Sequence, residues 1–378
     1  MKNLLLIIIL TIYCLINFNS CKTDKKGYET ISLDLKSGID DVNFKIKSII
    51  KLETSDSSLI GRITKIVYFK DRFFILDRDI SKTLFIFDKS GKFIAKTKRG
   101  RGPNECINPL DFRIDSINNR IQLWDQANFK MMEYDFDLNL IKSEFYKGVG
   151  LINAENINND TLLVFSQLRG NITKENANKP SYFNYCIYSN TLNKPITKLL
   201  PTSKNLIGLS LESSICKTNR IIFVAPFDNT IYGIDKLQTK ILYYLDFGKL
   251  NLTKDDLTKG ISHIFQSARA GNRITSVDNL HENNQYLSFS FFYKKKLNFF
   301  IHSKDSKINY YSDIIFQEKR LPRCRLKGLT ANGNFLAISS PLEIKSFKFS
   351  DLNYENIAQN TKEPDNPYII IFNVDEIH

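Results

Sequence analysis

Residues 72–98, RFFILDRDISKTLFIFDKSGKFIAKTK, are echoed by residues 119–145, NRIQLWDQANFKMMEYDFDLNLIKSEF. In both segments an apolar strand ends in Asp (Asp77, Asp125), a second apolar strand ends in an aromatic residue and Asp, and a third strand follows a turn. The first Asp recurs after 48 residues and the second after 47. A period of this length, with several short strands in each unit, is typical of a β-propeller blade.

Working outward from these two units, apolar runs of strand length form four more. They begin near residues 150, 209, 273 and 326. The sequence therefore predicts an all-β, six-bladed β-propeller over residues 28–378. We expect one helical insertion near 253–270, where apolar residues recur at helical spacing, and a short one near 349–362.

A propeller needs its two ends joined, because an unpaired first or last blade would leave an open strand edge. We expect the early strand around Glu29–Leu35 to pair with the last blade, which makes the run Ile369–Phe372 central to closing the ring.

The N-terminus has the features of an export signal. Lys2 precedes an apolar run, Leu4–Ile16, that is short for a membrane span. The small residue Ser20 directly before Cys21 is similar to a bacterial lipobox. We predict a lipoprotein signal peptide over residues 1–20, a lipid anchor on Cys21 and a tether over 21–27. The alternative is an ordinary secretory signal that is cleaved nearby.

The formal charge of +13 invites a nucleic-acid interpretation, which we do not favour. Lys, Asn and Ile are abundant together, and the longest basic run, residues 294–296, lies between two strand-like segments and is expected to be a hairpin tip.

The cysteines of the predicted propeller are widely spaced and form no CxxC motif. We expect buried thiols in separate blades rather than a disulfide framework, although four cysteines allow three pairings. These residues are Cys106, Cys186, Cys216 and Cys324.

The sharpest local motif is GRGPNE, residues 100–105. Two Gly and a Pro predict a tight turn between adjacent blades, and the motif lacks the GK[ST] ending of a P-loop. The functional alternative is a binding site that holds an anionic or sugar ligand, because Arg binds carboxylate or phosphate with two parallel hydrogen bonds. Its residues would be Arg99, Arg101, Asn104 and Glu105.

Recurring Asp residues raise a second alternative, calcium or another divalent metal in the channel. They end strands at equivalent repeat positions, where Asp commonly bonds to its own backbone, so we interpret them as turn residues. This set is Asp77, Asp88, Asp125, Asp135 and Asp235. The four His residues (His263, His281, His302, His378) form no HxH or HExxH motif, and no GxSxG is present, so no catalytic residue is assigned.

Four stretches carry a resemblance to a family: LETSDSSLIGRITKIVYF (52–69), GRGPNE (100–105), DNTIYGID with ILYYLDFGKLNL (228–252), and DNPYIIIFNV (365–374). With the lipobox, the chain resembles the six-bladed β-propeller lipoproteins of Bacteroidetes, which are related in fold to NHL-type propellers. The resemblance implies an exported module that recognises something, near glycan or peptide uptake machinery.

We therefore expect a membrane-anchored protein of the bacterial cell envelope, periplasmic or on the outer-membrane surface. It would act as a binding module for a glycan, a peptide or a partner protein, through loops that project from a rigid scaffold. The alternative is a metal-dependent hydrolase or lyase with its site in the channel, which rests on analogy of fold. Nucleic acid is not an expected partner.

Overall fold

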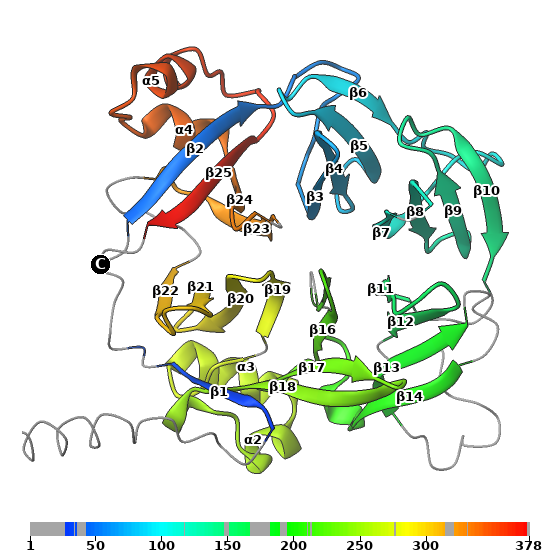
Figure 1. Cartoon of the computed structure of the whole chain (residues 1–378), viewed down its shortest axis with the longest axis vertical. Coiled ribbons are helices and arrows are strands. Elements are labelled where there is room, and N and C mark those ends of the chain that lie inside the picture. Colours follow the sequence, from blue (N-terminus) through cyan, green and yellow to red (C-terminus); the bar gives the residue numbers. More distant parts are fainter. Residues whose placement is uncertain are drawn as a thin grey trace, which may run out of the picture.

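The computed structural model of the 378-residue chain describes residues 27–33, 35, 43–116, 118–146, 151–166, 182–189, 195–209, 211, 214–275, 277–313, 321–330 and 332–375. These residues form six β-sheets around a central axis (Figure 1). The predicted six-bladed propeller is confirmed. The predicted signal peptide and Cys21 lie outside the described residues.

Each blade runs from an inner strand at the axis to an outer strand at the outer edge of the propeller. Blade 1 contains β3 (Lys65–Phe69), β4 (Arg72–Asp77), β5 (Thr83–Asp88) and β6 (Phe93–Lys96). Blade 2 contains β7 (Pro109–Asp115), β8 (Arg120–Asp125), β9 (Lys130–Tyr134) and β10 (Leu140–Phe145). Blade 3 contains β11 (Asn153–Asn156), β12 (Thr161–Phe165), β13 (Tyr182–Ser189) and β14 (Pro195–Thr202).

The other half of the ring follows the same order. Blade 4 contains β15 (Ile215–Lys217), β16 (Ile221–Val224), β17 (Thr230–Asp235) and β18 (Gln238–Asp246). Blade 5 contains β19 (Val277–Glu282), β20 (Tyr286–Tyr293), β21 (Lys296–Ser303) and β22 (Asn309–Asp313). Blade 6 contains β23 (Arg325–Leu329), β24 (Phe335–Ser339), β25 (Tyr368–Asp375) and, from the other end of the chain, β2 (Asn43–Lys51).

The middle strands are buried on both faces. In β4 every residue after Arg72 is buried, and in β5 every residue before Asp88 is buried. Each blade is covered by a neighbour on either side, so its middle strands carry continuous apolar runs, while the outer strand β10 is almost wholly exposed. Trp124 of β8 is fully buried, as expected for a core residue.

The recurring Asp residues hold turns, as predicted. Asp77 accepts hydrogen bonds from the backbone N–H groups of residues 61, 62, 80 and 81, and so ties the segment before β3 to the β4–β5 turn. Asp125 does the same in blade 2, from residues 107, 108 and 127. Asp88 and Asp135 cap the next hairpin of their blades. This interpretation therefore holds for four of the five.

The ring is closed by β2, and our prediction for the early strand was wrong. β2 pairs with β25 in antiparallel fashion, with Ile49 opposite Ile370. The earlier strand β1 (Glu29–Ser32) instead pairs in parallel with β18, at the outer edge of blade 4. The segment after β2 contacts blade 1, because the Glu53 N–H donates to the Gly91 carbonyl at 2.8 Å, and β2 forms the outer strand of blade 6. The expected central role of Ile369–Phe372 is confirmed, because these residues pair with both β2 and β24.

Helices interrupt the strands where the sequence predicts them. The first insertion contains the 3-10 helix η3 (Gly248–Leu250), α2 (Lys254–Lys259) and α3 (Ile261–Ala270). Thr253 begins α2 by accepting a hydrogen bond from the Asp256 N–H. The second insertion contains α4 (Pro341–Ser346) and α5 (Leu352–Gln359). A further 3-10 helix, η2 (Lys204–Leu206), follows blade 3.

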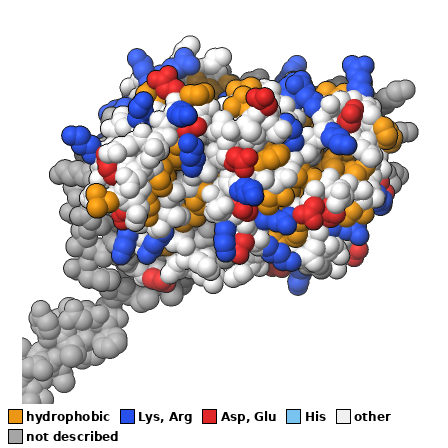
Figure 2. All heavy atoms as spheres, turned by 90° about the horizontal axis from the view of Figure 1, so that it is seen from above, with side chains coloured by type: hydrophobic (Ala, Val, Ile, Leu, Met, Phe, Trp, Pro, Cys, Tyr) orange, Lys and Arg blue, Asp and Glu red, His pale blue; other side chains and the backbone are white. Residues whose placement is uncertain are grey.

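Other expectations concern the surface and the thiols. Lys294 and Lys295 form the tip of the β20–β21 hairpin, as predicted. The four cysteines of the propeller are free thiols. Figure 2 shows basic and acidic side chains interspersed over the face that it draws. Among the described residues, no helix has the length and apolar character needed to cross a membrane.

Candidate functional site

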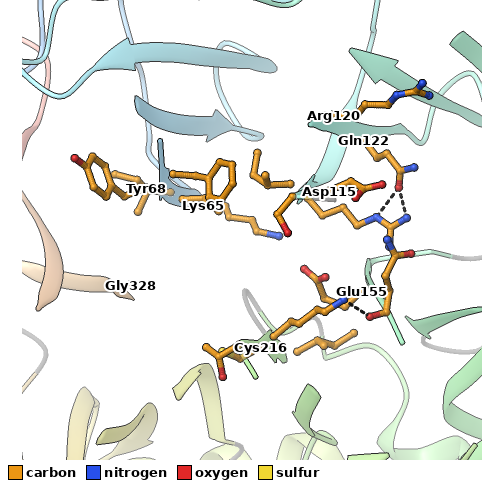
Figure 3. Close-up of a pocket in the computed structure, with 18 of the residues that line it drawn as sticks. Lys65, Tyr68, Asp115, Arg120, Gln122, Glu155, Cys216 and Gly328 are labelled. Atoms are coloured by element: carbon orange, nitrogen blue, oxygen red, sulfur yellow. Dashed lines mark hydrogen bonds between the residues drawn. The ribbon is translucent and has the colours of Figure 1, made fainter. Parts of the chain in front are cut away.

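A cavity of about 720 Å³ occupies the centre of the ring. All six inner strands contribute to its wall, and the loops that follow several of them form its rim. Figure 3 shows side chains from different blades, among them Lys65 and Glu155, extending into this space. The cavity is the candidate functional site.

Every inner strand contributes at least one ionisable side chain to the cavity wall, and β7 and β15 also contribute Asp115 and Lys217. We choose one such side chain from each strand and call this set the channel ring. Its members, in blade order, are Lys65, Arg113, Glu155, Cys216, His281 and Lys327. They sit at related positions because each blade places its inner strand beside the axis. Six residues that are far apart in the sequence therefore line one site.

Lys65 links the first two blades. Its Nζ donates hydrogen bonds to Asp111 Oδ1 at 2.8 Å and to the Phe112 carbonyl at 2.6 Å. Asp111 is almost fully buried, and burial raises the pKa of its carboxyl although Lys65 opposes the shift.

Arg113 donates its hydrogen bonds to an amide, and among the described residues it forms no ion pair, although the carboxylates of Glu155 and Asp115 are near enough to raise its pKa. Its Nε donates to Gln122 Oε1 at 2.6 Å, Nη2 donates to the same oxygen, and the guanidinium lies 5.5 Å from the centre of the Trp124 ring. Burial lowers the pKa of Arg113 to about 10, which leaves it charged at neutral pH. Within the described part of the chain, its Nη1 has no hydrogen-bond partner, and neither does the buried Oδ1 of Asn156 in the same wall.

Lys327 and Lys217 add two more cations. Lys327 is buried, and its Nζ donates to the Thr64 carbonyl at 3.5 Å, which connects blade 6 to blade 1. Lys217, next to Cys216, is exposed at the rim and donates to the Asn156 carbonyl at 2.7 Å.

Glu155 faces these cations from blade 3. Burial raises the pKa of its carboxyl, Lys65 and Arg113 oppose the shift, and Asp111 adds to it. No hydrogen bond to this carboxylate comes from any residue that the structure describes. Among the described residues, Glu155 therefore has electrostatic neighbours but no hydrogen-bond donor.

Cys216 and His281 are neutral at pH 7. Burial raises the pKa of the Cys216 thiol to about 12. Burial, with a further contribution from Lys327 and Lys65, lowers the pKa of His281 to about 3. His281 Nε2 lies 3.1 Å from Asn279 Oδ1, and Cys216 Sγ accepts from the Glu282 N–H at 3.4 Å.

The rim is polar with an aromatic edge. Arg120 forms an ion pair with Glu133 at 2.9 Å, and Lys142 pairs with Glu144 at 2.7 Å, so these charges are balanced locally. Other polar side chains come from the loops after the inner strands: Ser116, Asn118, Asn158, Asn159, Thr218 and Thr330. Tyr68 lines the blade 1 side.

The GRGPNE loop lies elsewhere. It precedes β7, whereas the cavity is lined by the end of that strand. Glu105 accepts a hydrogen bond from the Gly102 N–H at 2.8 Å, and a side chain at Gly100 would collide with the Glu105 carboxylate, so the predicted turn is confirmed. None of the four predicted binding residues lines the cavity, and Arg99, Arg101 and Asn104 are exposed around the turn. Their binding role stays a prediction.

The structure also shows a Ser, His and Asp in contact outside the channel. His263 Nε2 lies 3.1 Å from Asp256 Oδ1 and 3.5 Å from Ser267 Oγ. Both contacts use the same ring nitrogen, so a proton relay through the imidazole has no geometric support. Across the described residues no group of three or more His, Cys, Asp or Glu side chains is arranged to hold a metal.

Sequence reasoning missed the channel ring. Its members are single residues on six strands, without a shared motif. The only signal available was position, because residues near the middle of every inner strand must face the axis once the blades are aligned.

Comparison with known proteins relates the chain to a family and to solved propellers. A family model described as "Domain of unknown function (DUF4934)" matches residues 33–373. A protein from Bacteroides fragilis NCTC 9343, provisionally described as exported, is 20% identical with a TM-score of 0.78, over 92% of this chain and 99% of that one. A DUF4221 family member from Bacteroides vulgatus ATCC 8482 is 10% identical with a TM-score of 0.56, over 89% and 99%. No curated protein matches.

Proposed function

This chain belongs to the DUF4934 family, and we propose that it is an exported propeller that binds a small polar ligand in its central channel. The observation that carries this proposal is the cavity of about 720 Å³, walled by all six blades. Small-molecule sites typically have volumes of roughly 300–1,000 Å³ and place a few polar groups at fixed positions.

The lining favours a glycan or a peptide. Asn, Ser and Thr side chains at the rim suit hydroxyl and amide groups, and Tyr68 offers an aromatic surface on which a sugar ring or a side chain can pack. A partner protein is the remaining class, and it would contact the outside of the ring rather than enter a cavity of this size.

We further propose that the protein is anchored by lipid on Cys21 in the bacterial cell envelope. The apolar segment before Cys21 supports this location, as does the likeness in fold to a protein provisionally described as exported. Anchoring at the N-terminus would leave the channel accessible to ligands outside the cytoplasm.

The alternative is a metal-dependent hydrolase or lyase that uses the same cavity. It predicts that the purified protein retains a stoichiometric divalent metal, which elemental analysis measures directly, and that a bound ligand is chemically changed.

The test is a thermal-shift screen of the mature protein against neutral and acidic sugars, short peptides and divalent cations. A ligand at about 100 times its Kd stabilises the folded state by roughly 2.7 kcal/mol, which gives a measurable rise in Tm. Thr218→Trp should narrow the mouth of the cavity and abolish the rise. The matched control is Thr239→Trp, on the exposed outer strand β18. A shift that both variants retain would place the ligand outside the channel.

A further inference from the structure

The channel ring carries an excess of positive charge. Lys65, Arg113 and Lys327 are cationic, Glu155 is its one carboxyl group, and Cys216 and His281 are neutral at pH 7. Asp111 stands behind Lys65, and Lys217 adds a fourth cation at the rim. Over the whole wall, Arg120 and Lys142 bring the cations to six, and the carboxylates are the four of Asp115, Glu133, Glu144 and Glu155, so positive charge is in excess.

Much of this charge is held by neutral groups. Arg113 bonds to an amide oxygen, and Lys217 bonds to a backbone carbonyl. Neutral acceptors position a cation without cancelling its charge, and in a partly enclosed cavity charge is screened less than in open water. Two other cations of the wall differ, because Arg120 and Lys142 each have a carboxylate partner.

The responses of His281 and Glu155 agree with a positive centre, whereas the nearby carboxylates, among them Glu155 and Asp115, act to raise the pKa of Arg113. Both charged neighbours that act on His281 lower its pKa. For Glu155, three cations oppose the effect of burial and only Asp111 adds to it.

We propose that the channel ring recognises an anionic oxygen group of the ligand, the carboxylate of an acidic sugar or of an acidic peptide, between the cations of blades 1, 2 and 6. This inference rests on the proposed function and narrows its ligand class. Charged hydrogen bonds to an oxyanion are shorter and stronger than neutral ones, and Glu155 is left to accept a hydroxyl or amide hydrogen of the same ligand. The alternative role of the cations is to offset the protein's own buried carboxylates, Asp111 and Glu155. Anion recognition predicts that Glu155→Gln strengthens the binding of an acidic ligand, and the alternative predicts that it weakens this binding.

The experiment is calorimetric titration of the full mature chain with matched ligand pairs. D-galacturonate is compared with D-galactose, and N-acetylglutamate with N-acetylglutamine, so that the two sources of the carboxylate are measured separately. The variants are Lys327→Gln and Lys217→Gln, which each remove a cation, and Glu155→Gln, which removes the carboxylate. Lys295→Gln, at the exposed hairpin tip, makes the same charge change away from the cavity.

The expected result is tighter binding of the acidic member of one pair, by about tenfold or more, which corresponds to roughly one charge-assisted hydrogen bond. Lys327→Gln should weaken that binding by about tenfold and Lys217→Gln by less, while Lys295→Gln leaves it unchanged. Glu155→Gln should strengthen it, and no loss of folding can mimic a gain in affinity.

Two results would overturn the inference and leave the proposed function standing. In the first, neutral ligands bind as tightly as acidic ones, and Thr218→Trp abolishes the binding of both. The channel would then be a binding site without a preference for anions. Weaker acidic-ligand binding in Glu155→Gln would show that the ring cations serve the protein's own carboxylates. If no ligand of either kind binds, the proposed function and this inference both fail.

Discussion

Lys65, which lines the central cavity from blade 1, places its Nζ 2.8 Å from Asp111 Oδ1 of blade 2. The pair joins two blades, and its lysine also belongs to the channel ring. Asp111 is buried and its second carboxylate oxygen has no hydrogen-bond partner among the described residues, so Lys65 is the main group that stabilises its charge.

The first prediction concerns this pair. Lys65→Gln should lower the free energy of unfolding by about 1–3 kcal/mol, because it leaves a buried carboxylate without its cation. The double variant with Asp111→Asn should recover much of that loss, and urea denaturation of the four proteins measures the coupling. Additive losses would show that the two side chains are energetically independent.

The second prediction is a pH dependence of ligand binding. Since the pKa of Glu155 is raised, lowering the pH from neutral protonates this carboxyl and removes a negative charge from the ring. Affinity for a sulfated sugar, whose own charge stays constant, should therefore rise as the pH falls toward the pKa of Glu155. His281 stays neutral over this interval, because its pKa is about 3.

The control for that profile is Glu155→Gln, which should bind the sulfated sugar with a smaller pH dependence, since only Asp111, whose pKa is also raised, is left to add to it. A slope that is unchanged in this variant would assign the effect to Asp111 or another group.

The third prediction concerns Asp77, which recurs as Asp125 in the next blade. Burial alone would raise the pKa of this carboxyl, but four backbone N–H groups outweigh burial and hold its pKa below the ordinary value. The stability that ionised Asp77 contributes is therefore present above about pH 4, its unfolded pKa, and is lost as the pH falls through the lower folded value.

Asp77→Ala should cost about 2–4 kcal/mol at pH 7, because buried donors lose their acceptor. Asp79→Ala removes an exposed ion pair with Arg62 and should cost less than about 1 kcal/mol. Chemical denaturation at pH 7 and pH 3 compares them, and a difference that does not shrink at pH 3 would argue against the carboxylate's role.

The sequence predicted the ring because its repeat is local: residues 72–98 and 119–145 each hold three consecutive strands of one blade. The helical insertion near 253–270 was also predicted, from apolar residues at helical spacing that lie within the segment itself. The closure was assigned to the wrong strand. Two early segments could supply it, and in the structure the one that pairs with β25 is β2, which lies nearer to β3 in the sequence.

The site could not be predicted in the same way. Lys65 and Lys327 lie at opposite ends of the sequence and become neighbours only when blade 6 meets blade 1. Inner strands such as β11 and β15 are three or four residues long, too short for their pattern to reveal which residues face the axis. The GRGPNE motif was conspicuous because a tight turn needs special residues, which is a requirement of the backbone and independent of binding.

The fourth prediction concerns location. Cys21→Ser should abolish incorporation of a labelled fatty acid in a bacterial host and move the protein from the membrane to the soluble fraction, because stable anchoring needs acyl chains in the bilayer. Cys106→Ser should leave both readouts unchanged. Membrane association without label, in the parent protein, would contradict a lipid anchor.

The measurement that tests the central claim most directly is the crystal structure of the protein with the tightest ligand from the screen. We predict ligand density inside the ring, with its anionic oxygen atoms within about 3 Å of Lys65, Arg113 or Lys327 and a donor group facing Glu155. Ligand density at the exposed side chains of Arg99 and Arg101 beside β7, with an empty channel, would contradict the account. It would identify the GRGPNE loop as the binding site.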